Sequence, residues 1–218
     1  PTAARQPSST QGAHAPLHSP PRAKRRPTHA GTATQTRILL AVCALANEAG
    51  LGAVSIATVA ERAGCAKASV LYHFATREAL LVAAVDAALA PWWQAQRAAL
   101  RGSGDARAAL DAWIEAVFGC GEAALRLRAQ VDAEPPNQPA TVLLSDAERD
   151  IEAELAELLA RGHHAHCWRV PRGVSTATML RALADGMLIA ALRTGDASAL
   201  VGARTLCRTA ALDLLFRV

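Results

Sequence analysis

The sequence lacks long apolar segments, and it contains few aromatic residues. Aromatic side chains make up 4% of the 218 residues, although 51% of the residues are hydrophobic. The longest apolar run, residues 38–46, is nine residues long, whereas a membrane-spanning helix needs roughly 20. Residues 1–30 hold no apolar stretch of the kind that a signal peptide requires. We therefore expect no membrane association.

Paired cysteines are also lacking. The chain has five cysteines, an odd number, and none of them forms a CxxC motif. Most lie within helical patterns, where a thiol behaves as a small apolar side chain. A reducing cytoplasm is the simplest interpretation, because disulfide frameworks normally use an even number of cysteines.

Known catalytic motifs are missing from the sequence as well. It contains no GxSxG, no HExxH and no phosphate-binding GxxxxGK motif, so we predict no enzymatic activity, no catalytic residue and no cofactor. The segment His163-His164-Ala165-His166-Cys167 is the one candidate for a metal site. No acid or distant cysteine is spaced to complete a tetrahedral set, so we predict no metal and keep a metal site as the alternative.

What the sequence has is helical periodicity rich in alanine and leucine, with no alternating strand pattern. We predict an all-α fold of about nine helices. The first helix begins at Thr36 and ends before Gly50, and Pro91 should end or kink the fourth. Glycine and proline breaks place the other helices at residues 56–63, 67–72, 77–90, 105–119, 121–133, 141–161, 174–194 and 196–218.

The N-terminal segment differs in composition from the rest of the chain. Residues 1–35 are rich in Pro, Ser, Thr and Gln, and residues 1–36 hold five of the 23 basic residues and none of the 19 acidic ones. We predict a disordered basic arm over residues 1–35. Its run Arg22-Ala23-Lys24-Arg25-Arg26 is either a solvated cluster or a contact to the DNA backbone or minor groove. Two domains should follow, at residues 36–80 and 81–218.

Two short helices with a tight turn at Gly64 predict a helix-turn-helix in the first of these domains. Ser55 is a suitable N-cap for the first helix, and Gly64 tolerates the positive φ that the turn demands. The expected small core consists of Val59, Ala60, Ala63, Val70, Leu71 and Phe74. The side chains expected to face outward, which are types that meet DNA, are Lys67, Ala68, Ser69, Tyr72 and His73.

Residues 55–81, SIATVAERAGCAKASVLYHFATREALL, resemble the TetR family of bacterial regulators. The family pattern reads T-x-x-x-I-A-x-x-A-G-V-S-x-x-x-[LV]-Y-x-[HY]-F-x-[ST]-[KR]-E-x-L, and the resemblance is specific over residues 36–85. Three positions depart from the pattern. Cys65 replaces the usual hydrophobic residue, Ala66 replaces a capping serine, and Leu71 replaces the usual tyrosine, with Tyr72 one residue later.

The resemblance implies a DNA-binding surface. Lys67, Ser69, Tyr72 and His73 would contact bases or phosphates, and Ser55, Thr58 and Arg77 would contact phosphates. The complete set that we predict for DNA binding is Ser55, Ala57, Thr58, Ala66, Lys67, Ala68, Ser69, Tyr72, His73 and Arg77.

In the family, the last two helices pair with those of a second subunit, and the body between holds a small-molecule effector. Apolar stripes on the last two helices predict a homodimer interface at Leu180, Leu183, Met187, Leu188, Ala191, Leu206, Ala210 and Leu214. The alternative is that these stripes face the chain's own core. The predicted pocket lining, for which plain core packing is the alternative, is Trp92, Trp93, Trp113, Phe118, Leu125, Arg128, Leu144 and Met179.

The sequence therefore predicts a DNA-binding transcriptional regulator of the bacterial cytoplasm, associated with the nucleoid. We expect a homodimeric repressor that leaves its operator DNA when an unidentified small-molecule effector binds. Two alternatives stay open at this point. One is a transcriptional activator of the same fold, and the other is an all-α small-molecule binding protein or enzyme.

Overall fold

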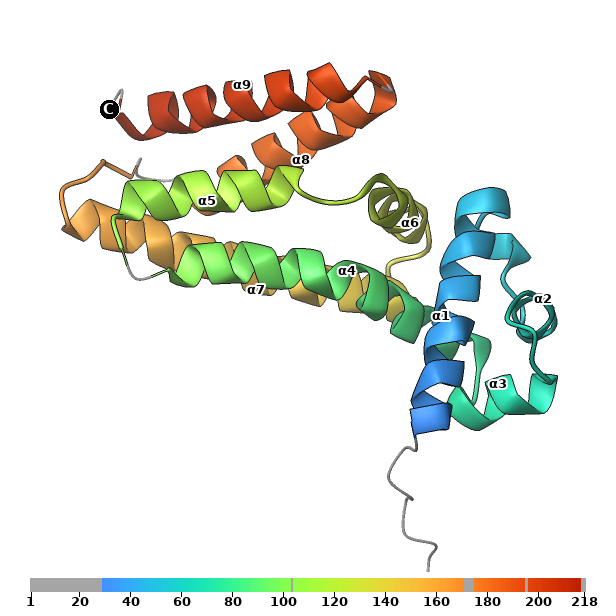
Figure 1. The fold of residues 1–218 in the computed structure, drawn as a ribbon. Helices are drawn as coiled ribbons and strands as arrows, with labels where there is room; N and C mark the ends of the chain where they lie inside the picture. Colours follow the sequence, from blue (N-terminus) through green and yellow to red (C-terminus); the bar gives the residue numbers. More distant parts are fainter. Residues whose placement is uncertain (1–28, 103, 171–174, 195, 217–218) are drawn as a thin grey trace, which may run out of the picture.

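The computed structural model describes residues 29–102, 104–170, 175–194 and 196–216, and all regular elements in these ranges are helical (Figure 1). The predicted all-α class is confirmed. In chain order the elements are α1 (His29–Ala49), the 3-10 helix η1 (Leu51–Ala53), α2 (Ile56–Arg62), α3 (Lys67–His73), α4 (Arg77–Arg101), α5 (Ala106–Phe118), α6 (Glu122–Asp132), α7 (Pro139–His164), α8 (Thr176–Thr194) and α9 (Ala197–Phe216).

The helices form two parts, a small head and a larger body. Helices α1, α2 and α3 make the head, and α5 to α9 make the body, while α4 starts in the head and runs through the body beside α7 (Figure 1). Helices α8 and α9 form a hairpin at the side of the body, packed on α5. Buried apolar residues form one continuous cluster from Ile38 in the head to Leu215 in the body.

Helix α4 is longer than predicted. It does not end at Pro91 but continues to Arg101, with Pro91 inside the helix. Proline removes one backbone hydrogen bond from a helix. Here the ring lies on the exposed side, while the following Trp92 and Trp93 are buried in the core. Burial of two indoles outweighs the lost bond, since a large apolar side chain contributes about 1.5–3 kcal/mol.

Two helix ends also differ. Helix α1 begins at His29, so part of the arm predicted for residues 1–35 is helical, while the basic run at residues 22–26 lies outside the described residues. Helix α7 continues to His164, three residues beyond its predicted end at Arg161. Within the described ranges no single helix is long and apolar enough to cross a membrane. Only α3 and α4 together, bent by 70°, reach the required length and composition.

A packed tryptophan sets the end of α7. His166 adopts a positive φ of 57°, and the Cys167 amide donates to the Gly162 carbonyl at 2.8 Å, which closes the helix. Trp168 then folds back and donates from Nε1 to the Leu159 carbonyl at 2.9 Å. Its ring covers Gly162 so closely that a Cβ there would lie 2.2 Å from Cζ2 of Trp168. Glycine at 162 is therefore required by packing.

We predict that Gly162→Ala lowers the free energy of unfolding by about 1–3 kcal/mol, the usual cost of overpacking a core. Denaturant unfolding followed by circular dichroism measures this change. Gly104→Ala is the control, because Gly104 lies outside the helices and no atom lies within 4 Å of a Cβ built there, and it should leave stability unchanged or raise it slightly. Equal stability of the two variants would contradict the packing argument.

Candidate nucleic-acid interface

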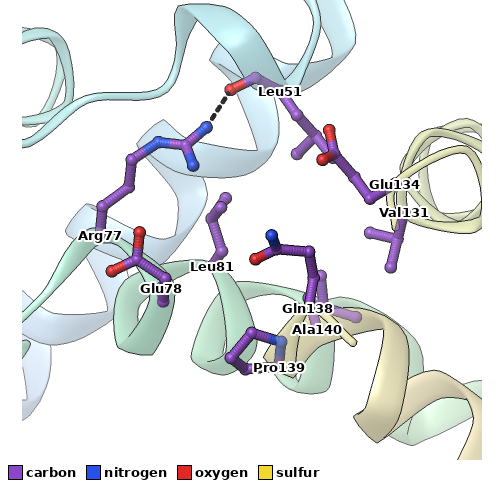
Figure 2. A pocket seen from close by; sticks show the side chains of 10 residues that line it. Leu51, Arg77, Glu78, Leu81, Val131, Glu134, Gln138, Pro139 and Ala140 are labelled. Atoms are coloured by element: carbon purple, nitrogen blue, oxygen red, sulfur yellow. Dashed lines mark hydrogen bonds between the residues drawn. The ribbon is translucent and has the colours of Figure 1, made fainter. Parts of the chain in front are cut away.

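The head is held to the start of α4 by one arginine. Arg77, in the first turn of α4, donates from Nε to the Val54 carbonyl at 2.7 Å and from Nη2 to the Leu51 carbonyl at 2.8 Å. Figure 2 shows the guanidinium reaching from α4 to Leu51, above a small cavity of about 30 Å³ that is also lined by Glu134 and Gln138. Arg77 therefore fixes the 3-10 turn that precedes α2 and sets the position of the helix-turn-helix.

A reciprocal cap starts α2. Ser55 Oγ accepts from the Thr58 amide at 3.1 Å, and Thr58 Oγ1 accepts from the Ser55 amide at 3.0 Å. The Thr58 hydroxyl also donates to the Ala53 carbonyl at 2.8 Å. Ser55 was correctly predicted as the N-cap. Both hydroxyls are engaged within the protein, so a phosphate contact from them would have to compete with these bonds.

The turn between α2 and α3 is a glycine C-cap. Gly64 has a φ of 61°, the Cys65 amide donates to Ala60 and the Gly64 amide donates to Glu61. Val59, Ala60, Ala63, Val70 and Phe74 are buried around this turn, as predicted. Ala66 precedes α3 without a side-chain cap, as its lack of a hydroxyl implies.

Leu71 is a correction to the predicted core, because its side chain is 49% exposed. It shares the outer face of α3 with Lys67, Ala68 and Tyr72, and Tyr72 is 82% exposed. Residues four apart on a helix lie on the same face, so Lys67 with Leu71 and Ala68 with Tyr72 make one strip. The four-residue spacing between Lys67 and Leu71 was therefore a sequence signal that predicts an exposed Leu71.

Ser69 and His73 lie at the edge of this strip and are half-buried. The His73 ring meets the Tyr72 ring edge-on, with 5.3 Å between ring centroids. This contact orients the phenol of Tyr72 along α3. Ala57 and Ala66 are exposed near it. The outer face of α3 thus combines a cation, an exposed phenol, an exposed leucine and the small side chain of Ala68.

The body contains a second candidate site, a small cavity between α4, α5, α6, α7 and α8. Four predicted pocket residues line it: Trp92, Trp93, Trp113 and Arg128. The other four do not. Met179 is largely exposed, Phe118 is half-buried, and Leu125 and Leu144 are buried elsewhere in the core. The lining residues that sequence reasoning missed are Gln96, Val117, Glu148, Ile151, Arg181, Ala184 and Asp185.

Arg128 is the buried cation of this cavity. Its side chain is 9% exposed, and its Nη atoms donate to both carboxylate oxygens of Asp185 at 3.1 Å. Nη2 lies 2.8 Å from Oε1 of Glu148, and the guanidinium lies 5.4 Å from the centroid of the Trp92 ring. Burial opposes the charge of Arg128, but Asp185, Glu148 and Asp132 raise its pKa above the usual value. Arg128 is therefore charged at any physiological pH.

Arg181 adds a second cation on α8. It lies 3.3 Å from Glu148, 3.3 Å from Glu152 and 3.2 Å from Asp185. Burial raises the pKa of Glu148, and the two guanidinium groups oppose that rise. The carboxylates of Glu148 and Asp185 could not have been assigned to the cavity from the sequence. They come from separate helices, and in the sequence they look like ordinary solvent-exposed acidic residues.

The head of the chain matches a known protein family. Residues 38–84 match the family model described as bacterial regulatory proteins, tetR family. The match covers α1 from Ile38, the whole helix-turn-helix and the first turns of α4.

Over residues 38–84, the chain is similar to the TetR family of bacterial regulatory proteins.

Solved structures of transcriptional regulators share the fold of most of this chain. A transcriptional regulator from Saccharomonospora viridis, in complex with choline, is 24% identical with a TM-score of 0.70, over 82% of this chain and 95% of that one. NemR of E. coli in its reduced form is 20% identical, with a TM-score of 0.64, over 79% and 94%. A TetR regulator from Haloarcula marismortui is 18% identical, with a TM-score of 0.72, over 84% and 99%. No curated protein matches the chain by sequence.

Relative to the TetR pattern, Leu71 stands at the tyrosine position and is exposed there. Tyr72 does not replace that tyrosine in place, since it lies one residue, or about 100° around α3, further on. The histidine cluster of residues 163–166 lies at the end of α7 and in the turn after it. Among the described residues, no three His, Cys, Asp or Glu side chains converge as metal ligands would.

Arg77 is a second correction, because its guanidinium points to backbone carbonyls of the head and not outward as a phosphate contact would. We predict that Arg77→Met lowers the free energy of unfolding by about 1–3 kcal/mol through two lost charge-assisted bonds. The slope of log affinity for DNA against log salt should stay unchanged, as measured by fluorescence anisotropy at several salt concentrations. A slope reduced by about one would restore the phosphate assignment.

Proposed function

We propose that the chain is a homodimeric repressor that binds operator DNA through α3 and leaves it when a small molecule binds in the body. The observation that carries this proposal is the exposed strip of Lys67, Ala68, Leu71 and Tyr72 on a helix braced from behind by a buried core. An exposed phenol and an exposed leucine on a short helix are unusual in a surface that only meets water.

The strip has the chemistry of a major-groove reader. Lys67 can pair with a phosphate or a guanine edge, and Ser69 can hydrogen-bond a base or a phosphate. Leu71 offers an apolar contact for a thymine methyl, in place of the phenol that the family pattern has there. Ala66 and Ala68 keep the helix narrow enough to enter the groove, and Ala57 does the same at the start of α2. Arg77 supports this surface from behind, through its hydrogen bonds to the Val54 and Leu51 carbonyls.

The proposed dimer interface needs revision from the one expected. Leu180, Leu188 and Ala191 are buried against the chain's own core, and Leu183, Met187, Ala210 and Leu214 are half-buried. Leu206 remains exposed on α9, together with Val201, and Ile189 is exposed on α8. We propose that this outer face of the α8–α9 hairpin meets its copy in a second subunit. Two heads would then read two half-sites of the operator.

A physical link joins the body to the head. Gln130 on α6 donates from Nε2 to the Ala46 carbonyl near the end of α1, at 2.9 Å. Helix α4 connects the same two parts directly, with the cavity residues Trp92 and Trp93 in its second half. A ligand that moves α4 or α6 would change the spacing of the two heads, which is the population shift that we propose. We propose that this takes place in the cytoplasm, on nucleoid DNA, without an enzymatic step.

A mobility-shift assay with DNA from the chain's own promoter region tests this function. We expect a sequence-selective, salt-sensitive shift, and Lys67→Ala should weaken binding about equally for all sequences while it lowers the salt slope by about one. Tyr72→Ala should weaken binding mainly to the preferred sequence. Gln94→Ala, an exposed position in the middle of α4, is the control. A chain that shows no selective shift would refute the proposal.

The dimer has its own test. Leu206→Glu should raise the dissociation constant of the dimer by at least about a hundredfold, because two copies of a buried apolar contact become two buried charges. Sedimentation velocity measures the change. Leu40→Glu is the matched control, an exposed leucine on α1 in the head, and it should leave the dimer intact. Dissociation by both variants, or by neither, would place the interface elsewhere.

A further inference from the structure

An open groove lies beside the body cavity and shares two of its lining residues. The volume of this cavity is about 10 Å³, room for one water molecule at most. Beside it, between α7 and the start of α8, lies an open groove of about 480 Å³ lined by Ser145, Glu152 and Ser175. Glu148 and Arg181 line both the cavity and the groove. These two side chains therefore form the wall between the buried tryptophans and solvent.

Arg181 is held less firmly in that wall than Arg128. Its contacts to Glu148, Glu152 and Asp185 are 3.2–3.3 Å, longer than the roughly 2.7–2.9 Å of strong charge-assisted bonds. Its side chain is 25% exposed, against 9% for Arg128. A guanidinium on a flexible stem with weak contacts and access to solvent can swing out into the groove. Arg181 thus has the position of a plug between the cavity and the groove.

The charges around the plug favour a cation. The cluster joins the guanidinium groups of Arg128 and Arg181 to four carboxylates, those of Asp132, Glu148, Glu152 and Asp185. Once Arg181 has left, the negative excess grows by one charge. Indole faces attract cations as well, and desolvation strengthens that attraction. An anion entering here would meet carboxylates that are already in excess.

Two buried donors point to a second feature of the ligand. Trp93 and Trp113 line the cavity, are 5% and 1% exposed, and their Nε1 atoms have no hydrogen-bond partner in the structure. Trp92, in contrast, donates to the carbonyls of Ala116 and Val117. An indole N–H can only donate, and a buried unpaired donor is costly. A ligand oxygen could accept from these groups.

We propose that the cavity binds a small organic cation that carries a hydrogen-bond acceptor, and that the cation enters by displacing the guanidinium of Arg181. The exchange of one cation for another leaves the charge of the cluster unchanged. The carboxylates of Glu148 and Asp185 take the positive end of the ligand, the tryptophan faces take its apolar body, and the indole N–H groups take its oxygen. This inference rests on the proposed function, because it names the class of effector for the body site.

Isothermal titration of the purified full chain tests the ligand class with choline as the probe. Its control is 3,3-dimethylbutan-1-ol, which has the same shape and hydroxyl but no charge. We expect saturable binding of choline, and binding of the neutral alcohol at least about tenfold weaker. Tetramethylammonium, which lacks the hydroxyl, should fall between the two. Equal binding of choline and the alcohol, no binding of choline, or tighter binding of octanoate would overturn the proposal.

Variants test the plug. Arg181→Met keeps the length of the side chain and removes its charge, so it should tighten choline binding at least about fivefold. A salt bridge with a purely structural role would give no such gain. Glu148→Gln should weaken choline binding at least about tenfold. Asp150→Asn is the matched control, since it removes a carboxylate from the outer side of α7, where Asp150 pairs with Arg97, and it should leave choline binding unchanged.

Circular dichroism checks that each variant is folded. If Arg181→Met does not fold, Arg181→Lys replaces it. This variant keeps the charge but loses the planar fork, so it should leave the cavity easier to open and bind choline at least as tightly as the original chain. Weaker choline binding by either variant would overturn the proposal that Arg181 blocks the cavity. A chain that shifts promoter DNA but binds no cation refutes this inference alone, whereas one that binds choline but no DNA refutes the proposed repressor alone.

Discussion

Helix α4 is the constraint on which the rest of this structure depends, because a single rigid element belongs to both head and body. Its first turn holds the helix-turn-helix through Arg77, and its second half supplies two of the three indoles in the cavity. The helix stays intact through Pro91 because the tryptophans that follow are buried. A continuous helix transmits displacement along its axis. In the proposed mechanism, a rearrangement around Trp92 or Trp93 would move the base of the head.

The body holds an unusual amount of charge close to its core. Arg128 lies almost fully buried over an indole face, and its charge is balanced by Asp185 and Glu148 from two other helices. Removing one partner of such a group is costly, whereas a fully apolar replacement often is not. A core built for stability alone would not need this cluster. Its position between the tryptophans and an open groove agrees with our proposal that a small organic cation binds there.

The head shows how little of a DNA-reading surface has to be polar. Ser55 and Thr58 use their hydroxyls to cap α2, and Arg77 uses its donors on the backbone of the turn before it. These hydrogen bonds hold the head in shape, and Thr58 is also exposed on its surface. The outer strip of α3 is left to Lys67, Leu71 and Tyr72, so discrimination between DNA sequences would depend on shape and on apolar contacts to bases as much as on hydrogen bonds.

The sequence by itself determined the helical class, the turn at Gly64, the N-cap at Ser55 and the TetR resemblance, because these depend on residues close together in the chain. The tertiary structure decided the rest. The side of Leu71, the inward Arg77, the burial of Leu180 and Leu188, and the exposure of Met179 depend on which helices pack together. The carboxylates around Arg128 come from α6, α7 and α8 and meet only after folding. Local periodicity places a side chain on a face of its helix, but long-range packing decides what that face meets.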